Sequence, residues 1–65
     1  MIDILNLVNS EDGTEVIVTE LSYPTKRYMV KFMDTDANQN IATMFISELD
    51  YALHYARNLI EGTKP

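Results

Sequence analysis

The chain has 65 residues, of which 46% are hydrophobic and 23% charged; it contains no cysteine, and its formal net charge is −5. A chain of this length forms one small domain with a marginally stable core, and the lack of cysteine excludes disulfides and thiolate metal sites. The acidic balance disfavours direct binding to nucleic acid or membranes, because such binding depends on clustered Lys and Arg. No apolar run is long enough to span a bilayer and no signal peptide is evident, so we expect a soluble, cytoplasmic protein without a cofactor.

Two strands joined by a hairpin are predicted for the first third of the chain. Residues 2–8 fit a strand or a short helix, because two polar residues interrupt their apolar side chains; we favour the strand for its Ile and Val content. Asp12-Gly13 is a turn signal and predicts a positive φ at Gly13. Residues 15–21 contain four consecutive β-branched side chains and predict the second strand.

Two more strands are predicted for the middle of the chain, over residues 26–33 and 40–46, after a break at Tyr23-Pro24. Alternation along the first of them favours one set of side chains as its core face: Tyr28, Val30 and Phe32.

An amphipathic helix is predicted for residues 48–61. Ser47 is the predicted N-cap and Asp50 occupies the position of a capping-box carboxylate. Gly62 is predicted to end the helix in the left-handed conformation. The apolar stripe of the helix comprises Leu49, Ala52, Leu53, Ala56, Leu59 and Ile60.

These elements predict a single α+β domain over residues 1–65, a small antiparallel β-meander of three to four strands packed against one C-terminal helix. One helix covers only one face of a sheet, and so small a core often needs a partner. We therefore expect a homodimer, or binding to another protein, through an apolar sheet face and a tyrosine edge of the helix. The predicted interface residues are Met29, Met33, Met44, Tyr51 and Tyr55.

The segment from Asp34 to Asn40 resembles the first part of an EF-hand loop, with oxygen side chains at Asp34, Asp36 and Asn38. The loop lacks the required glycine and the bidentate glutamate, since Gln39 and Phe45 stand at those positions. The favoured interpretation is a polar turn in which Asp and Asn side chains bind their own backbone, and metal binding is a weak alternative.

His54 is the only histidine, and it lies four residues after Asp50, with which it could pair on one helix face. A catalytic base needs an orienting group and a nucleophile or substrate within reach. The chain has no cysteine nucleophile and no hydrolase serine motif. We therefore expect a solvated or interface histidine and no enzyme activity.

The sequence best fits a non-catalytic interaction protein, an adaptor or a regulator that self-associates, and its size would suit a phage or mobile-element origin. One alternative is an acidic mimic of nucleic acid that inhibits a DNA-binding protein, which requires the carboxylates on one exposed ridge. The candidate carboxylates are Glu11, Asp12, Glu15, Glu20, Asp34, Asp36, Glu48 and Asp50. The other alternative is a calcium- or small-ligand-binding module that uses the segment 34–40.

Overall fold

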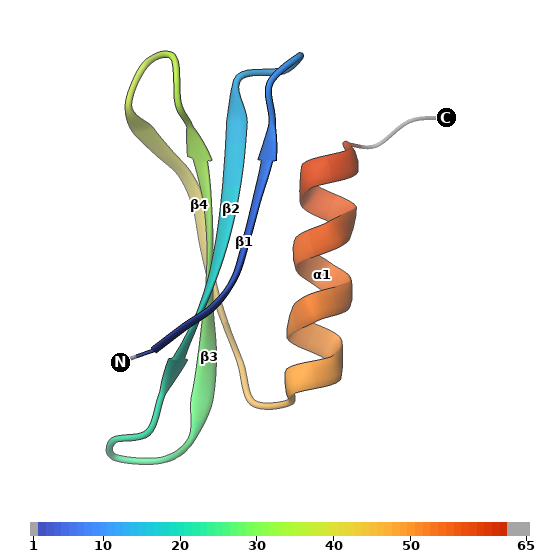
Figure 1. Ribbon diagram of the computed structural model, residues 1–65. Helices are drawn as coiled ribbons and strands as arrows, with labels where there is room; N and C mark the ends of the chain where they lie inside the picture. The colour runs from blue at the N-terminus through green and yellow to red at the C-terminus, as the bar shows by residue number, and fades with distance from the viewer. Residues whose placement is uncertain (1, 63–65) are drawn as a thin grey trace.

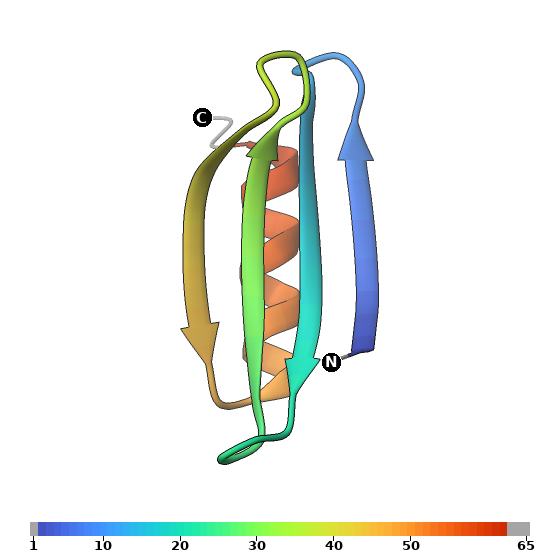
Figure 2. The same cartoon turned by 90° about the vertical axis from the view of Figure 1, so that its left-hand side faces the viewer.

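A computed structural model describes residues 2–62 as one four-stranded antiparallel sheet with a single helix across one face (Figures 1 and 2). The strands follow one another in chain order, β1-β2-β3-β4, so that β1 and β4 are the two edges. This confirms the predicted α+β meander, and it confirms the strand assignment for residues 2–8. The elements are β1 (Ile2–Asn9), β2 (Thr14–Leu21), β3 (Arg27–Asp34), β4 (Gln39–Ile46) and α1 (Leu49–Glu61).

The β1–β2 turn requires its glycine. Gly13 has a φ of 68°, as predicted from the Asp-Gly signal, and its N–H donates to the Asn9 carbonyl at 2.9 Å. The Gly13 carbonyl accepts from the N–H of Thr35 at 2.8 Å, which joins this turn to the β3–β4 turn. A Cβ atom on Gly13 would overlap with the side-chain carboxylate of Asp36.

We expect Gly13→Ala to lower the free energy of unfolding by about 1–2 kcal/mol, mostly through the cost of a positive φ, because the overlapping atoms are the end of the exposed Asp36 side chain, which can turn away. Gly62→Ala is the matched control: Gly62 also has a positive φ, 78°, but an added Cβ there meets no atom of residues 2–62 within 4 Å. Its expected loss is about 1 kcal/mol. Urea unfolding of both variants measures the difference, and equal losses would show that the contact with Asp36 costs nothing.

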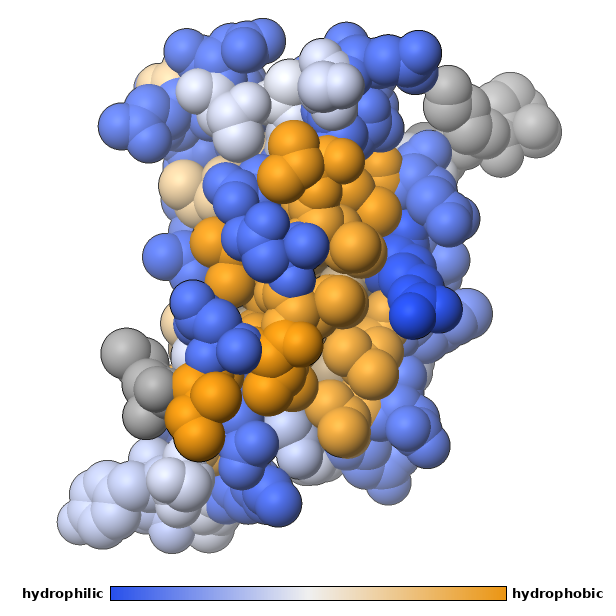
Figure 3. Space-filling view, in the orientation of Figure 1, coloured by the Kyte–Doolittle hydropathy of each residue, from blue (hydrophilic) through white to orange (hydrophobic). Residues whose placement is uncertain are grey.

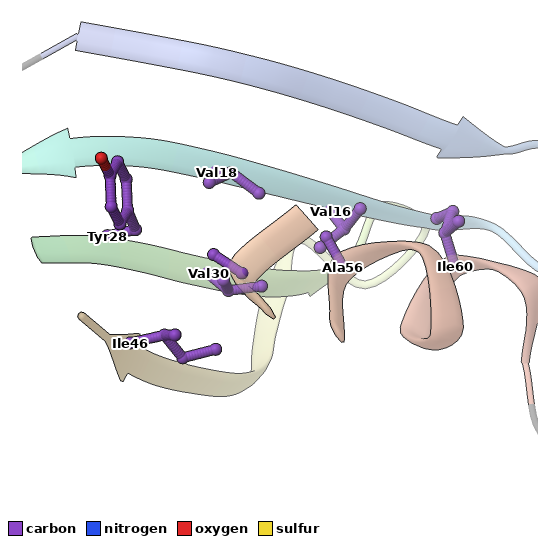
Figure 4. Packing of buried hydrophobic residues seen from close by; sticks show 8 residues of the cluster. Val16, Val18, Tyr28, Val30, Ile46, Ala56 and Ile60 are labelled. Carbon is purple, nitrogen blue, oxygen red and sulfur yellow. The ribbon is translucent and has the colours of Figure 1, made fainter. Parts of the chain in front are cut away.

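The core lies between α1 and the two central strands (Figure 4). Tyr28 and Val30 of β3 are buried and Phe32 packs against them, which confirms the predicted core face of that strand. The helix presents Ala52 and Ala56 to the sheet, and both are fully buried. Small side chains at these positions let the helix backbone approach the sheet closely. The complete buried cluster is Val16, Val18, Tyr28, Val30, Ile46, Ala52, Ala56 and Ile60.

The prediction that Ser47 caps the start of the helix was wrong. The helix begins at Leu49, and the N-cap is Glu48, which has extended geometry and makes no side-chain cap hydrogen bond. Ser47 therefore lies one residue too early to reach the free N–H groups of the first turn, and the capping box with Asp50 does not form. At the other end, the Gly62 N–H donates to the Leu59 carbonyl at 3.2 Å. Gly62 ends the helix with a positive φ, as predicted, but its ψ of 176° is extended rather than left-handed.

Candidate functional site

Exposed apolar side chains gather where the edge strand β1 meets α1 (Figure 3). Leu5 lies opposite Val18 and Leu7 opposite Val16, so both leucines face the helix and only partly enter the core. Ile2 and Val8, at the two ends of the strand, are each 63% exposed. We call this region the β1–α1 surface; it continues around the edge strand from the helix side of the sheet to the open side, where Val8 lies. Its residues are Ile2, Ile4, Leu5, Leu7, Val8, Leu49 and Leu53.

The helix contributes to this surface because the sheet buries only part of its apolar stripe. Leu49 and Leu53 are spaced four residues apart and share a flank with Ile60, seven residues after Leu53. That flank belongs to the β1 side, since the Asn9 side chain donates to the Ile60 carbonyl at 3.0 Å. Leu49 remains exposed and Leu53 half-buried, so the stripe continues the apolar surface of the strand.

Among the described residues β1 pairs only with β2, so its outer backbone edge is open. A bulge at Ile4 shifts the register between Asp3 and Leu5. Asp3, the only charged side chain in the strand, lies beyond that bulge and accepts a hydrogen bond from the Thr19 hydroxyl at 2.9 Å. Natural edge strands often carry Lys, Pro or inward charge that prevents pairing. The segment from Ile4 to Val8 carries none of these residues.

The predicted interface residues lie on two different surfaces. Met44, Tyr51 and Tyr55 come together, with Phe45 and Ile46, around a shallow cleft of about 290 Å³ between β4 and α1. Met29 instead lies opposite Phe45, on the sheet face that the helix leaves open, and Met33 shares that face.

The expectation that Met29, Met33 and Met44 share one face was therefore wrong. Met44 lies opposite the buried core residue Val30, and directly opposed residues project to the same side of a sheet. Alternation within a strand shows which of its own side chains share a face. The register between β3 and β4 is needed to know which face of β4 lies on the same side of the sheet as a given face of β3.

The open face of the sheet is mixed rather than apolar. Lys31 lies between Met29 and Met33 along β3, and the Arg27 guanidinium stacks over the ring of Phe45 at 5.5 Å from its centroid. Thr19 is buried on this face and donates to Asp3. These charges and hydrogen bonds interrupt the methionine side chains, so the open face offers less continuous apolar area than the β1–α1 surface.

The segment from Asp34 to Asn40 is a polar turn, as the favoured interpretation predicted. Asp34 Oδ1 accepts hydrogen bonds from the backbone N–H groups of Asp36 and Ala37, at 3.0 and 3.1 Å. Asn38 adopts a positive φ of 55°, a conformation that asparagine tolerates. Within residues 2–62, no group of three or more His, Cys, Asp or Glu side chains could hold a metal ion.

His54 is exposed on the polar side of α1, and its Nε2 atom lies 3.2 Å from the Asn58 side-chain nitrogen. The predicted partner, Asp50, makes no hydrogen bond or ion pair with it among the described residues. Both line a shallow hollow with Leu53 and Arg57. The side chain that contacts the His54 ring is therefore Asn58, one turn after His54, and not the predicted Asp50, one turn before it.

The candidate carboxylates separate to the two ends of the sheet. Glu20, Tyr28 and Ile46 lie in one row across the strands, and α1 begins close to the end of that row. Glu20, Glu48 and Asp50 therefore belong to the end where the helix starts. The remaining candidates lie at or beside the two joined turns of the other end: Glu11, Asp12, Glu15, Asp34 and Asp36.

Sequence reasoning missed the β1–α1 surface, although a signal for it was present. Residues 2–8 carry apolar side chains at both alternating sets of positions, Leu5 and Leu7 on one face and Ile4 and Val8 on the other. A half-buried strand with one solvated face shows apolar residues in only one of these sets. Apolar residues on both faces of an edge strand indicate a surface that another chain could cover.

Within the part of the chain that the structure describes, α1 lacks the length and apolarity of a membrane-crossing helix. The sequence matches no protein-family model, and no characterised protein or solved structure is significantly similar to it.

Proposed function

We propose that this chain is a non-catalytic interaction protein, an adaptor or regulator, that self-associates through its β1–α1 surface. The observation that carries the proposal is the joining of an open strand edge to exposed apolar side chains of β1 and α1. Monomeric proteins rarely leave contiguous apolar surface beside an edge segment that carries no Lys, Pro or inward charge. A second copy of the chain can form hydrogen bonds with the open backbone edge of β1 and can cover the exposed apolar side chains beside it.

The exposed area supports a dimer of modest size. Ile2 and Val8 are each 63% exposed, Leu49 39% and Ile4 37%. With side chains of roughly 200 Å² each, these exposures amount to on the order of 400 Å² per copy, about half of what a standard interface buries on each partner. The strand backbone and the half-buried leucines supply further area, so we expect a dimer that forms at micromolar concentrations or above.

The absence of a catalytic role is supported by the environment of the only histidine. His54 is exposed and lies against Asn58 rather than against a carboxylate. A general base is usually oriented by a second group and lies beside a site that excludes water. The hollow beside His54 is open and shallow, and its lining includes the charged side chains of Asp50 and Arg57.

Two matched variants test self-association. Val8→Glu places a charge on the β1–α1 surface, and Ile41→Glu places the same charge on β4, at a side chain of similar exposure, 52%. We expect the unaltered protein and Ile41→Glu to sediment as dimers and Val8→Glu to dissociate at least about tenfold more readily, because a charge buried at an interface costs more than 1.4 kcal/mol. Sedimentation equilibrium over a range of protein concentrations, with and without salt, measures the masses.

The outcomes of this experiment are distinct. A monomer for the unaltered protein at all concentrations would end the proposal of self-association. Dissociation of Ile41→Glu but not Val8→Glu would move the interface to β4 and its cleft with Met44, Tyr51 and Tyr55. Circular dichroism confirms that both variants remain folded, which we expect because both side chains are exposed.

A further inference from the structure

We propose that the second copy pairs with β1 itself, antiparallel and with a twofold axis at Asn6, to form a continuous eight-stranded sheet. This inference rests on the proposed self-association and names its geometry. Isologous pairing of β1 with β1 uses this edge in both copies, so it stops at a dimer. Pairing of β1 with β4 of another copy would leave one free β1 and one free β4, which can pair again and continue into a filament.

The register follows from the faces of the strand. Opposed residues of an antiparallel pair project to the same side, so partners must share a face. Leu5 and Leu7 face the helix, whereas Asn6 lies opposite Ile17 and Val8 opposite Glu15 on the open side. A twofold axis at Asn6 places Leu5 opposite Leu7 of the second copy and Asn6 opposite its own equivalent.

The same register also matches the remaining apolar residues. It places Ile4 opposite Val8 of the second copy, so every apolar side chain of the segment from Ile4 to Val8 has an apolar partner. An axis at Leu7 would instead place Val8 opposite Asn6 and Leu5 opposite Asn9, and both pairs combine an apolar residue with an amide. An axis at Leu5 would place Asp3 opposite Leu7, although the bulge puts these two on different faces.

Charge favours this pairing as well. The segment from Ile4 to Val8 has no charged side chain, so the acidic chain meets its copy without placing like charges opposite each other. Asp3 lies outside the paired segment, beyond the bulge, and is already hydrogen-bonded to Thr19. Glu15, the nearest acidic residue on β2, accepts a hydrogen bond from Asn6 at 2.7 Å, which fixes the amide at the proposed axis.

The other edge of the sheet is a weaker candidate. β4 is also uncharged, but its exposed aromatic residue, Phe45, has the Arg27 guanidinium over its ring at 5.5 Å from the centroid, so a charge lies beside this edge. Each edge strand has one bulge, β1 at Ile4 and β4 at Ile41, so this feature does not distinguish the two edges. The helix flank beside β4 carries tyrosines, whose hydroxyls need a polar partner when they are buried. β4 therefore serves as the control edge.

The proposed dimer places both α1 helices on one face of the joined sheet. Each helix lies over β2 and β3 of its own copy, so the two β1 strands separate the helices (Figure 2). The leucines of both β1 strands form the floor of the space between the helices, and Leu49 and Leu53 line its walls. The two β1 strands therefore make most of the contact between the copies, and the strand register is the property to test.

Cysteine crosslinking tests the register directly, since the chain has no cysteine of its own. Residues at a twofold axis of an antiparallel pair have Cα atoms about 4.5–5.5 Å apart, within the range of a disulfide. We expect Asn6→Cys to form a covalent dimer with diamide as oxidant, two thiols giving one disulfide while diamide is reduced to the hydrazine. The control Thr43→Cys, at the middle of β4, should crosslink at least about tenfold more slowly.

Asn6→Cys removes the hydrogen bond to Glu15 and could weaken the fold, so a second measurement tests the same register without changing Asn6. An equimolar mixture of Ile4→Cys and Val8→Cys should crosslink faster than either variant alone, because the register places these two positions opposite each other. Adding Val8→Glu to Asn6→Cys should slow its crosslinking.

Sedimentation of the same samples separates the two proposals. Faster crosslinking at Thr43 than at Asn6 in a dimeric sample overturns the β1 pairing while self-association stands. A dimer in which neither position crosslinks, and in which the mixture gains nothing over the single variants, overturns the strand pairing and leaves another surface as the interface. A monomeric sample that does not crosslink overturns both proposals.

Discussion

Replacing Tyr28 with Ala is expected to lower the free energy of unfolding by about 3–5 kcal/mol, the range found when a buried aromatic side chain is truncated. Tyr28 is only 6% exposed and belongs to the buried cluster between β3 and α1. A chain of this length has a total stability of roughly 3–10 kcal/mol. The variant should therefore be largely unfolded, or unfold at very low urea concentration.

Tyr23→Ala is the matched control for this prediction. It removes the same atoms from a side chain that is 87% exposed, in the connection between β2 and β3. We expect its stability to change by no more than about 0.5 kcal/mol. Urea unfolding followed by circular dichroism compares the two variants, and similar losses for both would contradict the position of Tyr28 in the core.

Replacing Ala56 with Leu is expected to cost about 3 kcal/mol, at the upper end of the range for overpacking a filled core. Ala56 is fully buried and lies beside Val16 (Figure 4). Three additional carbon atoms at this place would force the helix away from the sheet or the valines out of their rotamers. Because the helix contacts all four strands, its displacement affects the whole core.

Asn58→Leu provides the comparison on the same helix. Asn58 is exposed, and leucine has a higher helix propensity than asparagine, so we expect stability to stay within about 0.5 kcal/mol of the unaltered protein. Thermal unfolding of both variants at equal protein concentration measures the difference. If Ala56→Leu were as stable as Asn58→Leu, the helix would not approach the sheet as closely as these fully buried alanines indicate.

Local signals were sufficient for the elements after the first turn, whereas residues 2–8 fitted a strand or a short helix. The β-branched run of β2, the Asp-Gly turn and the three- and four-residue spacing in α1 act through neighbouring residues, and each predicted element appears within a residue or two of its expected bounds. The core face of β3 was also predictable, because alternation within a strand decides which side chains share a face. The helix cap was not predictable, because Ser47 and Glu48 compete for one position and the path of the chain from β4 decides between them.

The candidate site depended on relations between strands. Met44 could be assigned to a face only after its register with Val30 was known. The exposed apolar residues of β1 became a surface only because this strand is an edge and the leucine flank of α1 lies on its side.

Local backbone preferences and periodicity specify the strands and helix from residue 14 onward, the turn glycine and the apolar stripe of the helix, so these features could be predicted before the fold was known. Three other properties became known only from the folded chain: which strands are edges, which side chains share a face across strands, and where apolar area remains exposed. Those properties arise from contacts between residues far apart in the chain, and sequence spacing does not encode them.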